Sequence, residues 1–342
     1  MRPSRLGLAV ALVLAATLAE AGTASKLLFS GCGGLCLLDP DNVDAGPAPF
    51  LSPDHIDQFA RDFAGWCFQH AWSPDGDRIV FVTATGLPPN SDIWSVRSDG
   101  ADLRQLVRQR RQCEVDGSWR TEDERYDLCL PSFYYGISWS PDGSEIVFLD
   151  YKTISFLKPE DEIQEEPSDY VDVFMFAGRT GELQESAHSV DWAPNGRIYY
   201  CSGDWDGREI WSVSRDGTDS QFVHQGCSPE VSPDGTMISF LSADGLETTG
   251  VFVVDIDGSN PRFVAKGVRS SWSPDSKRLA VIEATGRRTG LIKLINADGT
   301  NPVVVHEFAG DVVNDVDWSP WLDAPTRVSP VSWGHLKQEL DP

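Results

Sequence analysis

The chain has 342 residues, 41% of them hydrophobic and 12 of them tryptophan, so it can bury the core of one large domain. Its formal net charge of -24 is spread along the sequence and argues against nucleic-acid binding, because phosphate recognition depends on Lys and Arg. The same acidity disfavours anionic membrane surfaces. Cations and basic partner surfaces remain compatible with it.

The first 21 residues have the three parts of a secretory signal peptide. Arg2 and Arg5 give a positive start, residues 6–18 are apolar, and Ala19-Glu20-Ala21 is a small-x-small cleavage site. The apolar run is too short for a membrane span, and no second run follows. We therefore predict a secreted or periplasmic monomer with no membrane span. We expect a signal peptide at 1–21, one folded domain at 22–320 and a C-terminal tail at 321–342.

Seven cysteines in an exported chain predict disulfides with one thiol left over. The spacing suggests three pairings: Cys113 with Cys129, Cys201 with Cys227, and Cys67 with Cys32 or Cys36. A buried free thiol is the alternative for Cys201, because its strand position is apolar in related segments. No C-x-x-C or H-E-x-x-H spacing occurs, so no metal centre is predicted.

One short motif, Trp139-Ser140-Pro141-Asp142-Gly143, recurs along the chain. Related segments lie at 72–76, 192–196, 231–235, 272–276 and, truncated, 318–320. Pro and Asp favour a turn after the Trp, an apolar strand follows, and an Asp-Gly hairpin comes later. Four short antiparallel strands for each copy are typical of a propeller blade. A bulky ring at the end of each first strand is expected to pack between blades.

The strands can be placed from these repeats. Second strands are expected at 78–83, 145–150, 197–202, 237–242 and 278–283, and third strands at 92–97, 172–176, 209–214, 250–256 and 291–296. Segments 26–30, 34–39 and 48–52 lack a first strand, which 315–320 can supply. The predicted fold is therefore an all-β, six-bladed β-propeller of four-stranded antiparallel blades, closed by pairing of the N- and C-terminal segments.

The repeat resembles the TolB-like, PD40 (WD40-like) β-propeller repeat, and the resemblance covers nearly the whole chain after residue 21. It implies a six-bladed propeller of the kind often found in periplasmic or cell-surface proteins. TolB itself carries an additional N-terminal α/β domain, for which this chain has no room, so its role in the Tol-Pal assembly is not carried over. Related propellers also precede peptidase domains, but neither such a domain nor a G-x-S-x-G motif occurs here.

The insertions are expected on one face. Motif positions 72, 139, 192, 231, 272 and 318 are 67, 53, 39, 41 and 46 residues apart, so about 40 residues make one blade. The residues beyond this length in the two longest intervals lie at 108–131 and 151–170, and the segment 53–66 before the first motif is also long. We assign 53–66 and 108–131 to fourth-to-first connections and 151–170 to a second-to-third connection. Connections of these two kinds lie on the same face of a propeller, and long loops on a rigid scaffold commonly bind ligands.

Polar and aromatic residues on that face are the candidate binding residues. They are Trp66, His70, Arg108, Arg110, Arg111, Trp119, Arg120, Tyr134, Tyr135, His188, Trp205, Asp206 and Arg208. Each has an ordinary structural alternative. The Arg cluster can offset the acidic segment 159–167, and each His can be a hydrogen-bonded structural residue.

Two functions are compatible with this pattern. The first is a non-catalytic scaffold that binds a protein or peptide through the loop-bearing face. The alternative is an extracellular glycan-active enzyme, a lyase or hydrolase, with a site at the channel mouth and with His70, His188 and Asp206 in acid–base roles. The lack of a catalytic motif favours the scaffold. No cofactor is predicted, and divalent-cation binding by the acidic loops is a third alternative.

Overall fold

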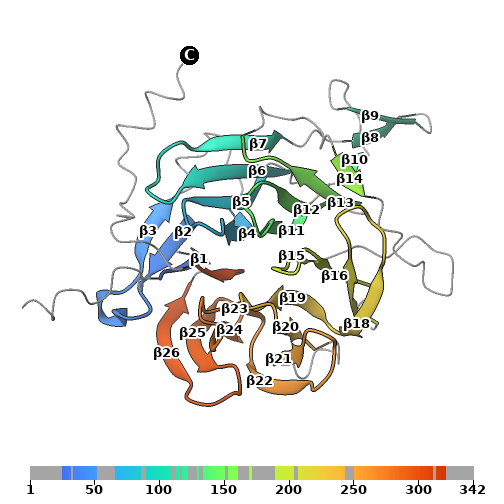
Figure 1. The fold of residues 1–342 in the computed structure, drawn as a ribbon. Helices are drawn as coiled ribbons and strands as arrows, with labels where there is room; N and C mark the ends of the chain where they lie inside the picture. The colour runs from blue at the N-terminus through green and yellow to red at the C-terminus, as the bar shows by residue number, and fades with distance from the viewer. Residues whose placement is uncertain are drawn as a thin grey trace, which may run out of the picture.

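The structure is a computed structural model. It describes residues 25–31, 34–51, 66–85, 90–108, 112–115, 118–121, 129–130, 134–150, 153–160, 169–171, 189–203, 207–242, 250–310 and 313–320. Six four-stranded antiparallel sheets surround a common centre (Figure 1). The predicted six-bladed propeller is therefore confirmed. Among the described residues, no helix is long and apolar enough to cross a membrane.

The blades are numbered here in chain order, with strands given from the centre outward. Blade 1 contains β27 (Val316–Trp318), β1 (Leu27–Gly31), β2 (Gly34–Leu38) and β3 (Ala48–Leu51), with a short 3-10 helix η1 (Val43–Ala45) before β3. Blade 2 contains β4 (Trp66–Trp72), β5 (Arg78–Thr85), β6 (Asn90–Arg97) and β7 (Arg104–Arg108). Blade 3 contains β11 (Tyr134–Trp139), β12 (Ile146–Asp150), β13 (Thr153–Leu157) and β14 (Asp169–Val171).

The second half of the ring repeats the same order. Blade 4 contains β15 (Val190–Trp192), β16 (Ile198–Ser202), β17 (Glu209–Val213) and β18 (Gln221–Gln225). Blade 5 contains β19 (Cys227–Val231), β20 (Met237–Leu241), β21 (Gly250–Asp255) and β22 (Arg262–Lys266). Blade 6 contains β23 (Arg269–Trp272), β24 (Arg278–Gly286), β25 (Thr289–Asn296) and β26 (Val303–Ala309).

Blade 1 is a composite of the two ends of the described chain. β27 pairs antiparallel with β1, with Leu27 opposite Trp318. The Ser319 N–H donates to the Lys26 carbonyl at 2.8 Å and extends this pairing. The predicted closure is confirmed, and it removes two free sheet edges that would otherwise expose unpaired backbone groups.

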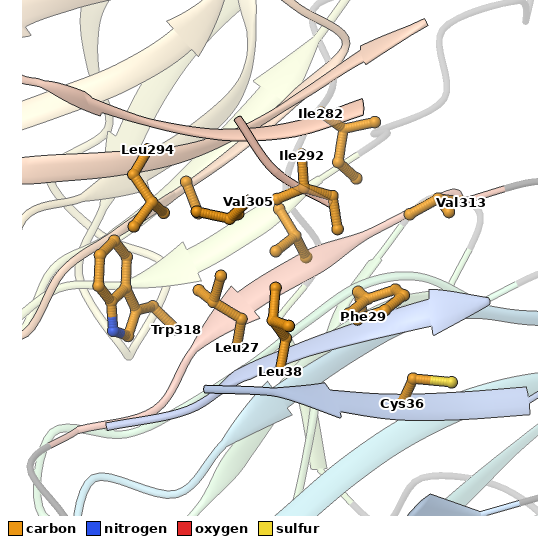
Figure 2. Packing of buried hydrophobic residues seen from close by; sticks show 12 residues of the cluster. Leu27, Phe29, Cys36, Leu38, Ile282, Ile292, Leu294, Val305, Val313 and Trp318 are labelled. Atoms are coloured by element: carbon orange, nitrogen blue, oxygen red, sulfur yellow. The ribbon is translucent and has the colours of Figure 1, made fainter. Parts of the chain in front are cut away.

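The core lies between blades rather than inside one sheet. Six apolar clusters occupy the six junctions between neighbouring blades. Figure 2 shows the junction of blades 6 and 1, where Trp318 and Leu27 meet Leu294 and Ile292. The motif Trp of each first strand belongs to the cluster shared with the preceding blade and is 3–8% exposed. The packing role predicted for these rings is confirmed.

The recurring Ser-Pro-Asp-Gly sequence builds the same turn in successive blades. In blade 3, the Ser140 hydroxyl donates to Asp142 at 2.7 Å, and the Ser144 N–H donates to the same carboxylate at 3.0 Å. Gly143 has φ 72, which a residue with a side chain rarely adopts. The turn aspartates thus satisfy backbone donors, as the sequence predicted.

The sequence prediction for the outer half of blade 3 is wrong. The third strand was expected at 172–176, but it is β13, which follows β12 after a two-residue connection and pairs Asp150 with Thr153. The apolar run at 153–157 follows β12 closely in the sequence and forms a tight hairpin with it. There is therefore no long second-to-third loop at 151–170. Residues 158–168 instead join the third strand to the fourth. The extra length of this repeat lies at 172–189, in the connection to blade 4.

The connection between blades 2 and 3, predicted as a long insertion at 108–131, contains its own sheet. Its strands are β8 (Gln112–Val115), β9 (Ser118–Thr121) and β10 (Cys129–Leu130), in the order β10-β8-β9. In Figure 1 this sheet lies outside the ring of blades. The backbone places Cys129 opposite Cys113. The side chains of this sheet are outside the described residues.

A disulfide joins Cys201 in β16 to Cys227 in β19 and so links blades 4 and 5. This pairing was one of those predicted, and it replaces the alternative of a buried free thiol. Cys36 is disulfide-bonded as well. Disulfides of this kind fit an oxidising compartment.

Candidate functional site: the axial cavity

The first strands of all six blades surround a central cavity of about 200 Å³. It is lined mainly by Gln69, His70, Ala71, Trp72, Gly136, Ile137, Ser138, Ser189, Val190, Asp191, Ser228, Pro229, Glu230, Arg269, Ser270, Asp315, Val316 and Asp317. These strands all run from the face with fourth-to-first connections toward the Pro-Asp-Gly turns. We call the former the loop-rich face and the latter the plain face.

A ring of hydrogen bonds joins successive first strands around this cavity. We call the residue just before each motif Trp or Val the clasp residue. In five blades its side chain accepts a hydrogen bond from the backbone N–H of the motif residue in the next blade. The five bonds are Trp72 to Asp317 (2.7 Å), Trp192 to Ser138 (3.2 Å), Val231 to Asp191 (2.7 Å), Trp272 to Glu230 (3.2 Å) and Trp318 to Ser271 (2.9 Å). Ala71 has no side-chain acceptor, and the Trp139 indole donates to its carbonyl instead, at 3.2 Å.

Three clasp residues are carboxylic acids: Asp191, Glu230 and Asp317, called here the channel acids. They keep some exposure because they face the cavity, but the protein encloses them on the other sides. Burial raises the pKa of Asp317 to about 7. Burial, together with repulsion from Asp317 and Asp191, raises the pKa of Glu230 well above its usual value. Part of this acid cluster is therefore protonated near neutral pH.

A second group of charges lies toward the loop-rich face. Arg269 approaches the Asp315 carboxylate at 3.8 Å and donates to the Ser228 hydroxyl at 3.3 Å. The His70 backbone N–H donates to the Asp315 carboxylate at 3.2 Å. Burial, and then the charge of Arg269, lowers the pKa of Arg208, so these two guanidinium groups are neighbours. The cavity therefore has an Arg269–Asp315 ion pair toward the loop-rich face and the three channel acids nearer the plain face.

The His70 imidazole is 4% exposed, and neither ring nitrogen has a hydrogen-bond partner. Burial lowers its pKa, although the Asp315 carboxylate opposes that shift, so the ring is neutral at pH 7. The corresponding first-strand positions in blades 3, 4 and 1 hold Ile137, Val190 and Val316. Blade 5 has Pro229 and blade 6 has Ser270 at this position, so four of the other five blades carry an apolar residue there.

The described residues include no group of three or more His, Cys, Asp or Glu side chains arranged to hold a metal ion. In the turns, the aspartates of the repeats accept hydrogen bonds from serine, threonine and backbone groups. Divalent-cation binding, the third alternative from the sequence, therefore has no ligand set in the part of the chain that is described.

The predicted binding residues occupy different parts of the molecule. His70 lines the cavity, Arg208 lies beside Arg269, and Trp66, Tyr134 and Tyr135 begin first strands on the loop-rich side. Arg108 ends β7, and Trp119 and Arg120 lie in β9 of the small outer sheet. Arg110, Arg111, His188, Trp205 and Asp206 fall outside the described residues. The convergence of His70 with His188 and Asp206 stays a prediction.

Sequence reasoning missed the channel acids, Arg269 and Asp315. A signal for the acids was present, because the channel acids immediately precede the motif residue in three copies. Side chains alternate along a strand, so a neighbour of a packed Trp faces away from the packed side.

The chain is 28% identical over 188 residues to "Protein TolB homolog" from Chlorobium luteolum, a match that covers 53% of this chain and 35% of that protein. The chain thus spans about a third of the length of that curated relative. No family model matches it.

Two solved structures share the fold. TolB from Acinetobacter baumannii has a TM-score of 0.62 at 13% identity, covering 87% of this chain and 67% of that one. A chain of a nidogen/laminin complex has a TM-score of 0.60 at 12% identity, covering 86% of this chain and 98% of that one. The fold expected from the TolB-like repeat is confirmed by these comparisons.

Proposed function

We propose that this TolB-like β-propeller is an exported scaffold that binds a protein or peptide through its loop-rich face. The supporting observation is the difference between the two ends of the blades. The three longest connections, 52–65, 109–133 and 172–189, all join a fourth strand to the next first strand. Most connections on the plain face are short turns tied by Asp side chains. A closed ring with one elaborated face is an arrangement suited to binding.

Charge and aromatic content favour a protein partner. Trp66, Tyr134 and Tyr135 begin first strands near the axis, and aromatic residues are enriched in protein interfaces. The net charge of -24 favours a partner with a basic contact surface. The nidogen/laminin structure shows that a propeller of this fold occurs in a complex of two proteins. The Cys201–Cys227 disulfide supports export, as does the predicted signal peptide.

Site-specific photo-crosslinking tests the choice of face. A benzophenone amino acid is placed at Arg288, in the exposed β24–β25 connection on the loop-rich face, or at Asp216, in the exposed β17–β18 turn on the plain face. Both positions are exposed and lie in short connections, so the two variants form a matched pair. After irradiation of producing cells, we expect a specific protein adduct from position 288 and none from position 216.

A second variant tests the insertion itself. Residues 109–133 are replaced by a short turn, which also removes Cys113 and Cys129 together and leaves neither unpaired. The adduct from position 288 should weaken, while the melting temperature of the propeller stays close to that of the parent. Equal adducts from both faces would contradict the proposal. So would an adduct from position 288 that is unchanged when 109–133 and 172–189 are both replaced by short turns.

An acid–base enzyme at the channel is the second candidate, because strongly shifted carboxyl groups often mark catalytic sites. Burial raises the pKa of Asp317 to about 7, within the range of a general acid. Incubation of the purified protein with acidic and neutral polysaccharides, followed by chromatography of the products, tests this candidate. Cleavage by the parent protein and its loss in Asp317→Asn would favour the enzyme over the scaffold.

A further inference from the structure

The outer edge of blade 6 differs from the edges of the other five blades. Its fourth strand, β26, has seven residues, whereas the other fourth strands have three to five. Among the described strands, none pairs with the outer side of β26, which lies at the rim of the ring in Figure 1. This side therefore carries backbone N–H and C=O groups that the sheet does not use.

Most of the other outer edges carry features that discourage the pairing of a further strand. Pro49 lies within β3, Arg104 and Arg108 are the end residues of β7, and Arg262 and Lys266 are those of β22. β14 has only three residues. Proline, basic side chains and short length are common protections of a free sheet edge. β26 contains no Pro, Lys or Arg and is the longest of the six.

The exposed side chains of β26 suit strand pairing. Of the four exposed positions, three are apolar: Val303, Val304 and Ala309. Val303 is 57% exposed and Val304 is 48% exposed, and they are two of the four large apolar side chains exposed in the described chain. Cross-strand contacts between β-branched side chains stabilise a sheet. The edge thus offers both free backbone groups and apolar side chains to an added strand.

The rest of the propeller holds this edge in place. β25 pairs with β26 along its whole length, from Leu294 opposite Val303 to Thr289 opposite Ala309. On the side of blade 1, the His306 ring lies 5.6 Å from that of Phe29, and Val305 belongs to the apolar cluster of that junction. A strand that is already ordered loses little conformational entropy when a partner binds.

The charge of this edge favours a basic partner. Glu307 is exposed and lies on the same face of the sheet as Val304. Asp298 lies in the turn that leads into β26, and hydrogen bonds from Thr300 lower its pKa, so this exposed carboxylate is ionised at neutral pH. Opposite charges on neighbouring strands stabilise their pairing, and like charges oppose it.

A second copy of the chain matches this edge less well. Paired with itself, β26 has no basic side chain to place opposite Glu307. Lys293, on the neighbouring strand, is bound to Glu283 at 2.5 Å and its side chain is only 12% exposed. Two copies would also bring together chains that each have a net charge of -24.

We propose that the outer edge of β26 binds an extended segment of a basic partner protein, which adds a fifth strand to blade 6. The backbone of the segment pairs with β26, its apolar side chains cover Val303 and Val304, and a Lys or Arg pairs with Glu307. This surface lies at the rim of the propeller. It is separate from the partner surface proposed for the loop-rich face, and neither proposal depends on the other.

Fluorescence anisotropy of a short labelled peptide with the full chain tests the proposal. The probe alternates valine and lysine, and one control alternates valine and glutamate. A second control is the valine–lysine peptide with N-methyl groups on its central residues, which keeps the charge but cannot pair as a strand. The probe should bind saturably, and both controls at least about tenfold more weakly. No saturable binding up to about 1 mM, or equal binding of the N-methylated peptide, overturns the proposal.

Two matched variants locate the site. Val304→Lys places a basic side chain on the edge and should weaken binding of the probe about tenfold, with a melting temperature close to that of the parent. Phe222→Lys is the control, because Phe222 is 51% exposed at the corresponding place in blade 4. It adds the same charge to the protein and should leave binding unchanged. An equal loss of binding in the two variants overturns the site.

Hydrogen exchange shows the bound strand directly. With the probe at saturation, the backbone amides of 303–309 should exchange about tenfold more slowly, while those of 221–225 are unchanged. Unchanged exchange at 303–309 overturns the proposal. Sedimentation of the chain alone tests the other occupant. A dimer that forms in the parent and is lost in Val304→Lys would assign this edge to a second copy and overturn the basic partner.

Discussion

The junction between blades 4 and 5 and the junction between blades 2 and 3 are built from the same repeat but are joined differently. Between blades 4 and 5, Asp191 accepts the Val231 N–H at 2.7 Å, and the Cys201–Cys227 disulfide adds a covalent link. Between blades 2 and 3, Ala71 has only its carbonyl to offer, to the Trp139 indole. The apolar clusters at the two junctions are similar in kind. Packing is thus common to the ring, while polar links differ from junction to junction.

Among the changes that test this comparison, loss of the disulfide between blades 4 and 5 should lower the free energy of unfolding the most. The two cysteines are 26 residues apart, and a loop of this size contributes about 3 kcal/mol in the chain-entropy account. The double variant Cys201→Ala/Cys227→Ala should lose about that much free energy of unfolding, measured by urea denaturation. The double change leaves no unpaired thiol at this position. An unchanged midpoint would show that the clasp and the apolar cluster already hold this junction.

Removal of the clasp at the same junction should cost about 2 kcal/mol. Asp191→Ala leaves the Val231 N–H and the Ser138 hydroxyl without their acceptor in an enclosed site. Asp191→Asn keeps an acceptor and should cost less than half as much. Equal unfolding free energies for the two variants would mean that the hydrogen bond does not stabilise the junction.

The junction of blades 1 and 2 should weaken as the pH rises. Burial raises the pKa of Asp317 to about 7, above the value of an unfolded aspartate, so the folded protein holds this proton more tightly. The resulting stability is complete below about pH 4 and is lost as the pH rises from about 4 to about 7, by up to about 1.4 kcal/mol for each unit, with no further loss from this group above that range. Urea denaturation from about pH 4 to about pH 8 measures this decline and its levelling off above about pH 7.

Asp317→Asn provides the matching control for the pH series. Its amide oxygen can still accept the Trp72 N–H, but the side chain has no proton to lose. The variant should therefore show a flatter dependence of stability on pH over the same range. A parent protein that is equally stable across the range would contradict the raised pKa.

A clasp added to the junction of blades 2 and 3 should give the smallest change. Ser138 and Ser271 act as clasps in blades 3 and 6, so Ala71→Ser should let blade 2 accept the Trp139 N–H. The expected gain is about 1 kcal/mol, the usual net value of one such bond. Ala71→Val adds volume without an acceptor and should give no gain. Equal stability of the Ser and Val variants would show that the bond does not form.

The sequence was informative where the repeat is regular. Blades 4, 5 and 6 have strands within a few residues of those expected, because each turn carries its own Pro, Asp or Gly signal. The prediction for blade 3 was wrong because two apolar runs, 153–157 and 172–176, were both suitable for its third strand. Pairing with β12 decided between them, and pairing partners are a property of the folded sheet rather than of a local segment.

The site was harder to predict than the fold. Asp191, Glu230 and Asp317 are separated by long stretches of sequence, and only the closure of the ring brings them to one cavity. Their raised pKa values come from enclosure by six blades, which no local motif encodes. His70 was identified from its place in a first strand, but the apolar residues at equivalent positions are what make it unusual.

The composite blade 1 also sets the order in which the protein can be completed. β1 is among the first strands to be synthesised, yet its inner neighbour, β27, comes after the strands of all the other blades. Until 316–318 have emerged, β1 has a free edge and the cluster around Trp318 cannot form. A chain caught before that moment is an open arc of blades with an unpaired inner edge, and the ring closes only when the final strand has been delivered.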